Sequence, residues 1–152
     1  MLDLSRYIFG PFCTQMLADM GADVIKIEPR ETGDPARQAG SVRVHGDSAS
    51  FLARNRNKRS LTVDLRQSAG QEIIRRLTTR SDVLIHNFRP GVMARFGLDA
   101  KRLRPLNPSL IYCSLSGYGQ DGPYKNLVGH DINYISIGGA LGVIGRLSLI
   151  HI

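Results

Sequence analysis

Cysteine is scarce in this chain of 152 residues, which contains only Cys13 and Cys113. The two lie far apart, there is no C-x-x-C motif, and the four histidines are not clustered. This arrangement argues against a zinc site and against a disulfide-stabilised scaffold. We therefore expect no metal and a reducing, cytoplasmic environment.

Long hydrophobic runs are also lacking. The opening MLDLSR carries charges where a signal peptide needs an apolar core, and the longest uncharged apolar stretch, YISIGGALGVIG, is too short to span a bilayer. No low-complexity tract or internal repeat is present. With 42% hydrophobic and 22% charged residues, the sequence predicts one soluble globular domain with no membrane partner.

Positive charge exceeds negative charge, and the formal net charge is +7. Such a field favours anionic partners, which include nucleic acid, anionic lipid and phosphorylated small molecules. The densest basic run, RNRNKR at residues 54–59, allows three interpretations: a solvated surface, a nucleic-acid site or a phosphate site. Phe51 is the only aromatic residue close to it, which weakens the nucleic-acid interpretation.

Short apolar runs alternate with helical patterns along the chain. The runs with strand length and composition are residues 1–4, 23–27, 61–65, 82–87 and 110–115. The helical faces between them are Phe12, Met16, Leu17 and Met20, followed by Gly21, and Ile73, Ile74 and Leu77, preceded by a Ser68/Gln71 capping box. Alternation of strand and helix requires crossover connections and hence parallel strands. The sequence therefore predicts an α/β, Rossmann-like three-layer α/β/α fold with a mostly parallel sheet.

Ligands of such sheets gather outside the carboxyl ends of the strands. We accordingly expect a site in the loops after Leu65, Asn87 and Ser114.

The stretch SGYGQDGPY, residues 116–124, contains a formal G-x-G-x-x-G built from Gly117, Gly119 and Gly122. A dinucleotide-binding loop needs a helix after the third glycine and an acidic residue about 20 positions further on. Pro123 follows the third glycine instead, and no acidic residue occurs after Asp131. The pattern favours a tight turn over a nucleotide cradle.

His130 lies between a glycine and an aspartate, where a helix is expected to begin near Asp131. A lone histidine in a loop is more often structural than catalytic. The free N–H groups of the helix start would nevertheless favour an anion or a developing oxyanion. Both interpretations stay open, whereas His45, His86 and His151 lack such a setting.

Five blocks carry a resemblance to a known family: GPFCTQMLADMGADVIKIEP, RNRNKRSLTVDLR, DVLIHNFRPGVMARFGL, LNPSLIYCSLSGYGQDGPY and GHDINYISIGGALGVIGR. In this order they resemble the class III CoA-transferase superfamily, the CaiB/BaiF group, which includes α-methylacyl-CoA racemases. The resemblance implies an acyl-CoA substrate and no cofactor other than coenzyme A as part of that substrate. It implies positive charge that pairs with the CoA phosphates, no nucleic-acid partner, and an interlocked homodimer as the assembled protein.

The resemblance also implies the residues of the CoA site. They are Val63, Asp64, Leu65, Arg66, Asn87, Phe88, Arg89, Arg95, Gly129, His130, Asp131, Ile132, Asn133 and Tyr134. Racemases place a further arginine just after the second strand. Pro29 occupies that position here, so we do not include the following Arg30 in the expected site.

The histidine of GHDINY resembles the racemase acid/base, whereas the better-known transferases tend to carry tyrosine there. We therefore expect racemase-like α-proton exchange on a 2-methylacyl-CoA, with His130 serving one face of the enolate. The alternative within the family is CoA transfer between an acyl-CoA and a carboxylic acid, in which an aspartate attacks the thioester. An alternative of another class is a basic nucleic-acid-binding module without catalysis, which the ordered blocks disfavour.

The resemblance ends at Arg146. We interpret residues 1–146 as part of a CoA-binding large domain and residues 147–152, LSLIHI, as a non-family tail of artefactual origin. The second catalytic residue of either enzymatic branch lies further along family chains. The sequence thus predicts an N-terminal fragment that is inactive alone.

Overall fold

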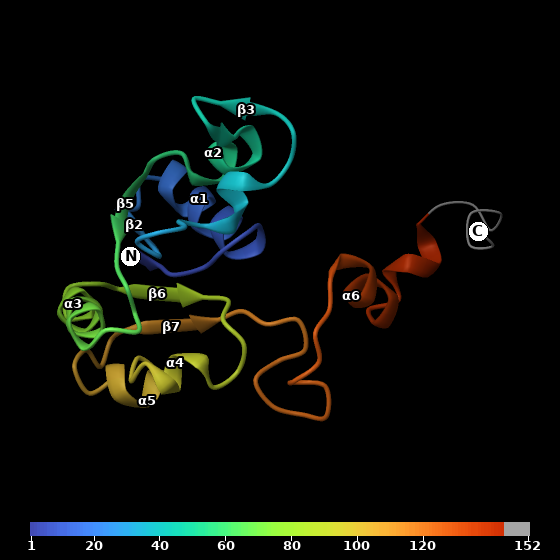
Figure 1. Ribbon diagram of the computed structural model, residues 1–152. Coiled ribbons are helices and arrows are strands. Elements are labelled where there is room, and N and C mark those ends of the chain that lie inside the picture. Colours follow the sequence, from blue (N-terminus) through green and yellow to red (C-terminus); the bar gives the residue numbers. More distant parts are fainter. Residues whose placement is uncertain (145–152) are drawn as a thin grey trace. The chain divides into compact units, whose positions relative to one another are not determined.

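The computed structural model describes residues 1–144 in two compact units, Met1–Leu115 and a second that begins at Ser116. The expected non-family tail, residues 147–152, lies outside the described residues. In the first unit, the strands of the main sheet are β1 (Leu2–Asp3), β2 (Val24–Glu28), β5 (Lys58–Thr62), β6 (Val83–His86) and β7 (Ile111–Ser114). All are parallel, in the order β5-β2-β1-β6-β7 (Figure 1). The predicted α/β fold with a mostly parallel sheet is confirmed.

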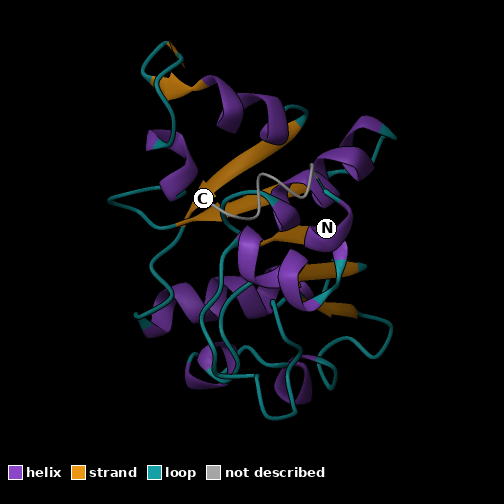
Figure 2. Cartoon of the chain, turned by 90° about the vertical axis from the view of Figure 1, so that its right-hand side faces the viewer, coloured by secondary structure: helices purple, strands orange, loops and turns teal. Residues whose placement is uncertain are grey.

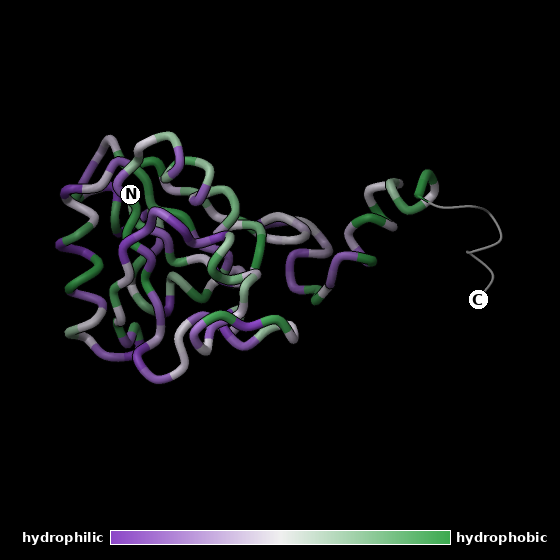
Figure 3. Tube along the Cα trace, turned by 90° about the horizontal axis from the view of Figure 1, so that it is seen from above, coloured by the Kyte–Doolittle hydropathy of each residue, from purple (hydrophilic) through white to green (hydrophobic). Residues whose placement is uncertain are grey.

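Helices flank the strands of this unit (Figure 2). They are α1 (Phe9–Asp19), the 3₁₀ helix η1 (Pro35–Gln38), α2 (Ala49–Asn55), α3 (Ser68–Thr78), α4 (Val92–Arg95) and α5 (Ala100–Leu103). Two short strands, β3 (Arg43–Val44) and β4 (Asp47–Ser48), form a separate antiparallel pair between η1 and α2. Figure 3 shows hydrophobic and hydrophilic stretches alternating along the trace, as the periodicity of these elements requires.

The two faces of the sheet differ in chemistry. Laterally paired residues of a parallel sheet point to the same face, and Leu2 pairs with both Ile25 and Leu84. Their face holds the apolar core, whose buried members are Leu2, Leu4, Ile27, Val63, Ile74, Leu84, Met93, Leu98, Leu103 and Leu110. On the opposite face Asp3 pairs with Lys26, and Lys26 with Ser60. That face is polar and carries charged side chains that are fully buried.

The polar face explains why the apolar side of α1 predicted from the sequence is not the buried side. Phe12, Met16 and Met20 are about half exposed or more, at 52%, 48% and 72%. Thr14 is buried instead, and its hydroxyl donates to Asp3 Oδ2 at 2.6 Å. Because the sheet beneath α1 presents a carboxylate, the helix turns its hydroxyl-bearing side inward. The prediction for this helix face was wrong.

Two further local predictions need correction. The predicted strand at residues 61–65 is β5, which runs three residues earlier, because Lys58 already pairs with Val24 of β2. The predicted Ser68/Gln71 capping box is absent, because Gln67 is the N-cap residue of α3 and the Gln71 amide donates to the Leu65 carbonyl at 3.0 Å. The predicted α3 face is only partly buried, since Ile74 is inaccessible but Ile73 is 43% exposed.

In the second unit, the glycines of the G-x-G-x-x-G stretch have structural roles. Tyr134, on α6 (Asp131–Ile137), lays its ring against Gly117, where an added Cβ would come within 2.1 Å of it. Gly119 has a φ of +86°, which L side chains rarely adopt. The glycines therefore serve close packing and a turn, and the remaining element, η2 (Ala140–Val143), follows α6.

We predict that Gly117→Ala loosens this packing. The added methyl overlaps the Tyr134 ring, and such overpacking typically costs about 1–3 kcal/mol. Amide hydrogen exchange in α6 should therefore be faster than in the unsubstituted protein. Gly142→Ala is the matched control, because a Cβ there meets no atom within 4 Å. Unchanged exchange in Gly117→Ala would contradict the packing role.

Within residues 1–144, no helix is long and apolar enough to cross a bilayer. In the same described part of the chain, His, Cys, Asp and Glu side chains form no group of three or more that could hold a metal ion.

Candidate ligand-binding site

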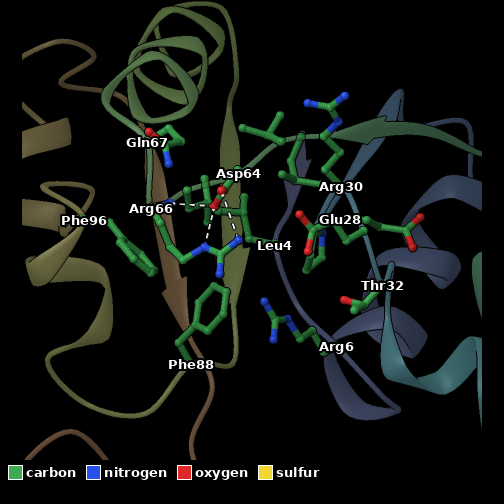
Figure 4. A pocket seen from close by; sticks show the side chains of 15 residues that line it. Leu4, Arg6, Glu28, Arg30, Thr32, Asp64, Arg66, Gln67, Phe88 and Phe96 are labelled. Carbon is green, nitrogen blue, oxygen red and sulfur yellow. Dashed lines mark hydrogen bonds and ion pairs between the residues drawn. The ribbon is translucent and has the colours of Figure 1, made fainter.

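The strand order of the first unit reverses between β1 and β6, and ligands of open α/β sheets bind at such a switch point. A cavity of about 540 Å³ opens next to this point, at the carboxyl ends of β1, β2 and β5, and Phe88 after β6 borders it (Figure 4). Its lining residues are Leu4, Arg6, Ile27, Glu28, Pro29, Arg30, Glu31, Thr32, Val63, Asp64, Leu65, Arg66, Gln67, Phe88 and Phe96. They come from the last two residues of β2, from the loops after β1, β2, β5 and β6, and from the end of α4.

Arginines and aromatic rings share this cavity. The Arg6 guanidinium lies over the Phe88 ring, 4.9 Å from its centroid, and within residues 1–144 it has no carboxylate partner. Arg66 is held by Asp64 through bonds of 2.9 and 3.1 Å, and these bonds lower the pKa of the Asp64 carboxyl. Figure 4 shows the side chains of Arg6 and Arg66 near the Phe88 ring. Guanidinium groups beside aromatic and apolar surface suit a ligand that combines phosphates with a flat or apolar part.

The cavity contains some of the residues predicted for the CoA site and not others. Val63, Asp64, Leu65, Arg66 and Phe88 line it. Asn87, Arg89 and Arg95 do not, although Asn87 lies one residue from the lining. Arg89 lies in the loop before α4 and Arg95 in its last turn, and both are exposed.

The other predicted residues form a local motif in the second unit. His130 is the exposed N-cap residue of α6, and its backbone N–H donates to Asn133 Oδ1 at 2.9 Å. The Tyr134 hydroxyl donates to the Gly129 carbonyl at 2.7 Å. Asp131 and Ile132 occupy the exposed first turn. The predicted helix start at Asp131 is thus confirmed.

Sequence reasoning missed the part of the cavity that follows β1 and β2. Arg6 comes two residues after Leu4, and Arg30, which we left out of the expected site, lines the cavity after β2. The signal was present, because the rule that ligands gather at carboxyl ends applies to the first two strands as well. We applied it only to the later loops.

His86 has a structural role that its sequence setting did not suggest. It is 3% exposed, and burial lowers its pKa to about 4, so the imidazole is neutral at physiological pH. Its Nδ1 accepts a hydrogen bond from the Phe88 backbone N–H at 3.2 Å. His86 therefore helps to fix the start of the loop that carries Phe88.

The basic run at residues 54–59 is largely neutralised by carboxylates. Arg56 pairs with Asp19 at 2.6 Å, Lys58 with Asp3 at 3.0 Å, and Arg59 with Asp23 at 2.6 Å. Its cations join β5 to the first strands and α1. This pairing favours a structural role for the run over a nucleic-acid surface.

A parallel sheet with this strand order and a cavity lined by arginines and aromatic rings define the class of protein: a Rossmann-like α/β domain whose cavity has the chemistry to suit an anionic ligand. The family model of CoA-transferase family III matches residues 1–148. The chain belongs to this family, and the resemblance found in the sequence is confirmed.

Individual relatives agree with this assignment. The chain is 44% identical over 148 residues to a succinyl-CoA–D-citramalate CoA-transferase of Chloroflexus aurantiacus, covering 97% of this chain and 36% of that protein. It is 43% identical over 152 residues to a succinate–glutarate CoA-transferase of Agrobacterium fabrum, covering 96% and 38%. It therefore spans little more than a third of the length of these relatives.

A solved structure shows the same fold. A CAIB/BAIF family protein from Brucella suis superposes with a TM-score of 0.89 at 43% identity, over 95% of this chain and 39% of that chain.

Proposed function

We propose that the protein acts in CoA transfer between an acyl-CoA and a carboxylic acid. The observation that carries this proposal is the set of relatives between 38% and 44% identical, whose names are those of CoA-transferases. They favour the alternative considered for the sequence over the racemase-like exchange that we expected first. On this view, the histidine of GHDINY does not mark a racemase, and His130 is a helix-capping residue.

The same names suggest the substrates. The relatives act on succinyl-CoA with D-citramalate or L-malate, or on glutarate together with succinate or succinyl-CoA, and all of these acids are dicarboxylic. We propose a short dicarboxylic acid as the acceptor. The reaction exchanges one acyl group for another on the CoA sulfur without a change of oxidation state, so it needs no redox cofactor.

The cavity supports a place for coenzyme A. Arg6, Arg30 and Arg66 provide charge for phosphates, and Phe88 and Phe96 provide flat apolar surface for the adenine ring. We propose that the cavity takes the nucleotide end of CoA. The expected phosphate contacts of Arg89 and Arg95 remain a prediction.

We also propose a homodimer for the assembled protein. The side of α1 that faces away from the sheet leaves Phe9, Phe12, Met16 and Met20 between 48% and 72% exposed. Clustered exposed apolar side chains mark interaction surfaces.

The test of the proposed function uses the protein translated from the complete open reading frame that encodes this chain. We expect CoA transfer from succinyl-CoA to a dicarboxylate, and no deuterium incorporation at C2 of a 2-methylacyl-CoA in D₂O. His130→Gln should leave the transfer rate within a few-fold, because the residue caps an exposed helix. Mass spectrometry of the thioesters measures both reactions.

The opposite result would restore the racemase interpretation. In that case C2 exchange occurs without transfer, and His130→Gln slows the exchange by about 10²–10⁴-fold, as expected for the loss of a positioned acid/base.

A further inference from the structure

The loop between β1 and α1 is held at three consecutive residues by side chains from other elements. Asn87, the residue directly after β6, makes two bonds to the backbone of Arg6: its Oδ1 accepts from the N–H at 2.9 Å, and its Nδ2 donates to the carbonyl at 2.8 Å. Both polar atoms of the Asn87 amide are thereby engaged by the Arg6 backbone. Asn87 is thus oriented toward the loop.

The residues on either side of Arg6 are held from β2 and η1. Lys26 Nζ donates to the Ser5 carbonyl at 2.9 Å, and Asp34 Oδ1 accepts from the Tyr7 N–H at 3.2 Å. Lys26 and Asp34 also pair with each other at 2.9 Å, and their side chains are 2% and 1% exposed. This buried ion pair joins β2 to the start of η1. We call Lys26, Asp34 and Asn87 the β1-loop clamp.

The clamp maintains an unfavourable backbone conformation. Tyr7 has a φ of +66°, a conformation that typically costs a non-glycine residue about 1–3 kcal/mol and persists only where the surrounding structure imposes it. The bonds to residues 5, 6 and 7 supply that constraint. Its consequence is the placement of Arg6, whose guanidinium is directed over Phe88 at the cavity wall.

We propose that Arg6 binds a phosphate group of coenzyme A, and that Asn87, Lys26 and Asp34 are positioning residues that act through it. This proposal rests on the proposed function and assigns roles within the same cavity. Arg6 is suited to the role because no carboxylate of residues 1–144 pairs with its guanidinium, which already lies on an aromatic ring. A guanidinium that is held in advance loses less freedom when it binds an anion. Asn87, expected to touch CoA, acts from behind the loop.

The contacts of Asn87 allow a double-mutant cycle. Within residues 1–144 the Asn87 side chain bonds only to the backbone of residue 6, so Arg6→Met leaves both of these bonds in place. A purely structural Asn87 would therefore affect CoA binding equally with or without the Arg6 side chain. A positioning Asn87 loses its effect on CoA once the guanidinium is gone.

The experiment measures the dissociation constant of CoA by calorimetry on the protein from the complete reading frame. We expect Arg6→Met and Asn87→Ala each to weaken CoA binding by about tenfold or more, the typical effect of losing a charged hydrogen bond. The double variant should bind within about twofold of Arg6→Met. Asn87→Ala should lower the melting temperature by the same amount in both backgrounds. Arg54→Met is the matched control and should bind CoA normally, because in the described part of the chain the Arg54 side chain bonds only to Ser50.

Two ligands identify the group that Arg6 recognises. If Arg6 binds the diphosphate, Arg6→Met should also weaken the binding of 3′-dephospho-CoA. If Arg6 binds the 3′-phosphate, Arg6→Met should leave the binding of 3′-dephospho-CoA unchanged. In either case Arg6→Met should not affect the binding of pantetheine, which has no phosphate. An equal effect on pantetheine would overturn the phosphate assignment.

Other results overturn the positioning role. Normal CoA binding by Arg6→Met would contradict this role. So would an Asn87→Ala substitution that weakens CoA binding as much in the Arg6→Met background as in the unsubstituted protein. If Asn87→Ala does not fold, Asn87→Asp replaces it in the same cycle, because it keeps the acceptor for the Arg6 N–H and removes the donor. A protein that neither binds nor transfers CoA would instead refute the proposed function, so the two failures are distinguishable.

Discussion

Asp3→Asn should destabilise the first unit by about 3–5 kcal/mol, the typical cost of removing one partner from a buried ion pair. The side chains of Asp3 and Lys58 are 0% and 1% exposed and lie 3.0 Å apart. Burial lowers the pKa of Lys58, and the Asp3 carboxylate partly offsets this effect. Without the carboxylate, the ammonium group is left with neutral acceptors, among them Pro11 O and Asn55 Oδ1. Urea unfolding measures the loss.

A second substitution distinguishes the charge effect from simple loss of packing. Lys58→Met in the Asp3→Asn background removes the unpaired charge and keeps most of the side-chain volume, so it should recover part of the lost stability. Asp23→Asn is the matched control. It breaks the Arg59 pair, whose side chains are 65% and 71% exposed, and should cost less than about 1 kcal/mol. An equal cost for Asp3→Asn and Asp23→Asn would contradict the buried-pair account.

The same ion pair shows where sequence reasoning reaches its limit. The five strands were predictable because apolar and β-branched residues recur at strand length, and the parallel order followed from the alternation with helices. A charged residue in such a run indicates a solvent-exposed face unless its partner is known. The partners Asp3 and Lys58 lie 55 residues apart, so no local pattern joins them. The start of β5 and the inward side of α1 were missed for this one reason.

Some residues of the candidate site could likewise be predicted from the sequence, and others could not. Val63 to Arg66 and Phe88 were predictable because they directly follow strands or match a family motif, and they line the cavity. Arg6 follows a strand of only two residues, and its backbone is held by Asn87, which is 81 residues away. Spacing along the chain predicts which loops meet at the edge of the sheet. It does not predict which polar side chains form hydrogen bonds to the backbone of a neighbouring loop.

Lowering the pH should remove about 3 kcal/mol of stability through Glu28 alone. This carboxylate is 2% exposed and accepts from Arg37 Nε and Nη2 at 2.8 and 2.7 Å, from the Asp34 N–H at 2.9 Å and from the Ser60 hydroxyl at 3.0 Å. Burial opposes its ionisation, but these bonds outweigh burial and lower its pKa from 4.5 to about 2. One pKa unit corresponds to about 1.4 kcal/mol.

The direction of the pH effect follows from which state binds the proton first. Because the folded-state pKa lies below that of the unfolded chain, the unfolded chain takes up the proton first as the pH falls. The stabilisation by Glu28 is therefore complete above about pH 5 and disappears as the pH approaches 2. Glu28→Gln removes the charge at every pH. It should be less stable than the unsubstituted protein by about 3 kcal/mol at pH 7, and the difference should shrink toward zero near pH 2.

Urea unfolding at several pH values between 7 and 2.5 measures this difference directly, because acid effects from other carboxylates cancel between the two proteins. Glu72→Gln is the control, since Glu72 is 58% exposed and its bond to Arg75 is long, at 3.4 Å. Its stability should stay within about 0.5 kcal/mol of the unsubstituted protein at each pH. A difference between the unsubstituted protein and Glu28→Gln that remains constant down to pH 2.5 would show that the charge of Glu28 does not stabilise the fold. The link between β2 and η1 that Arg37 and Glu28 provide would then depend on shape alone, and Asp34 in the β1-loop clamp would keep its position at low pH.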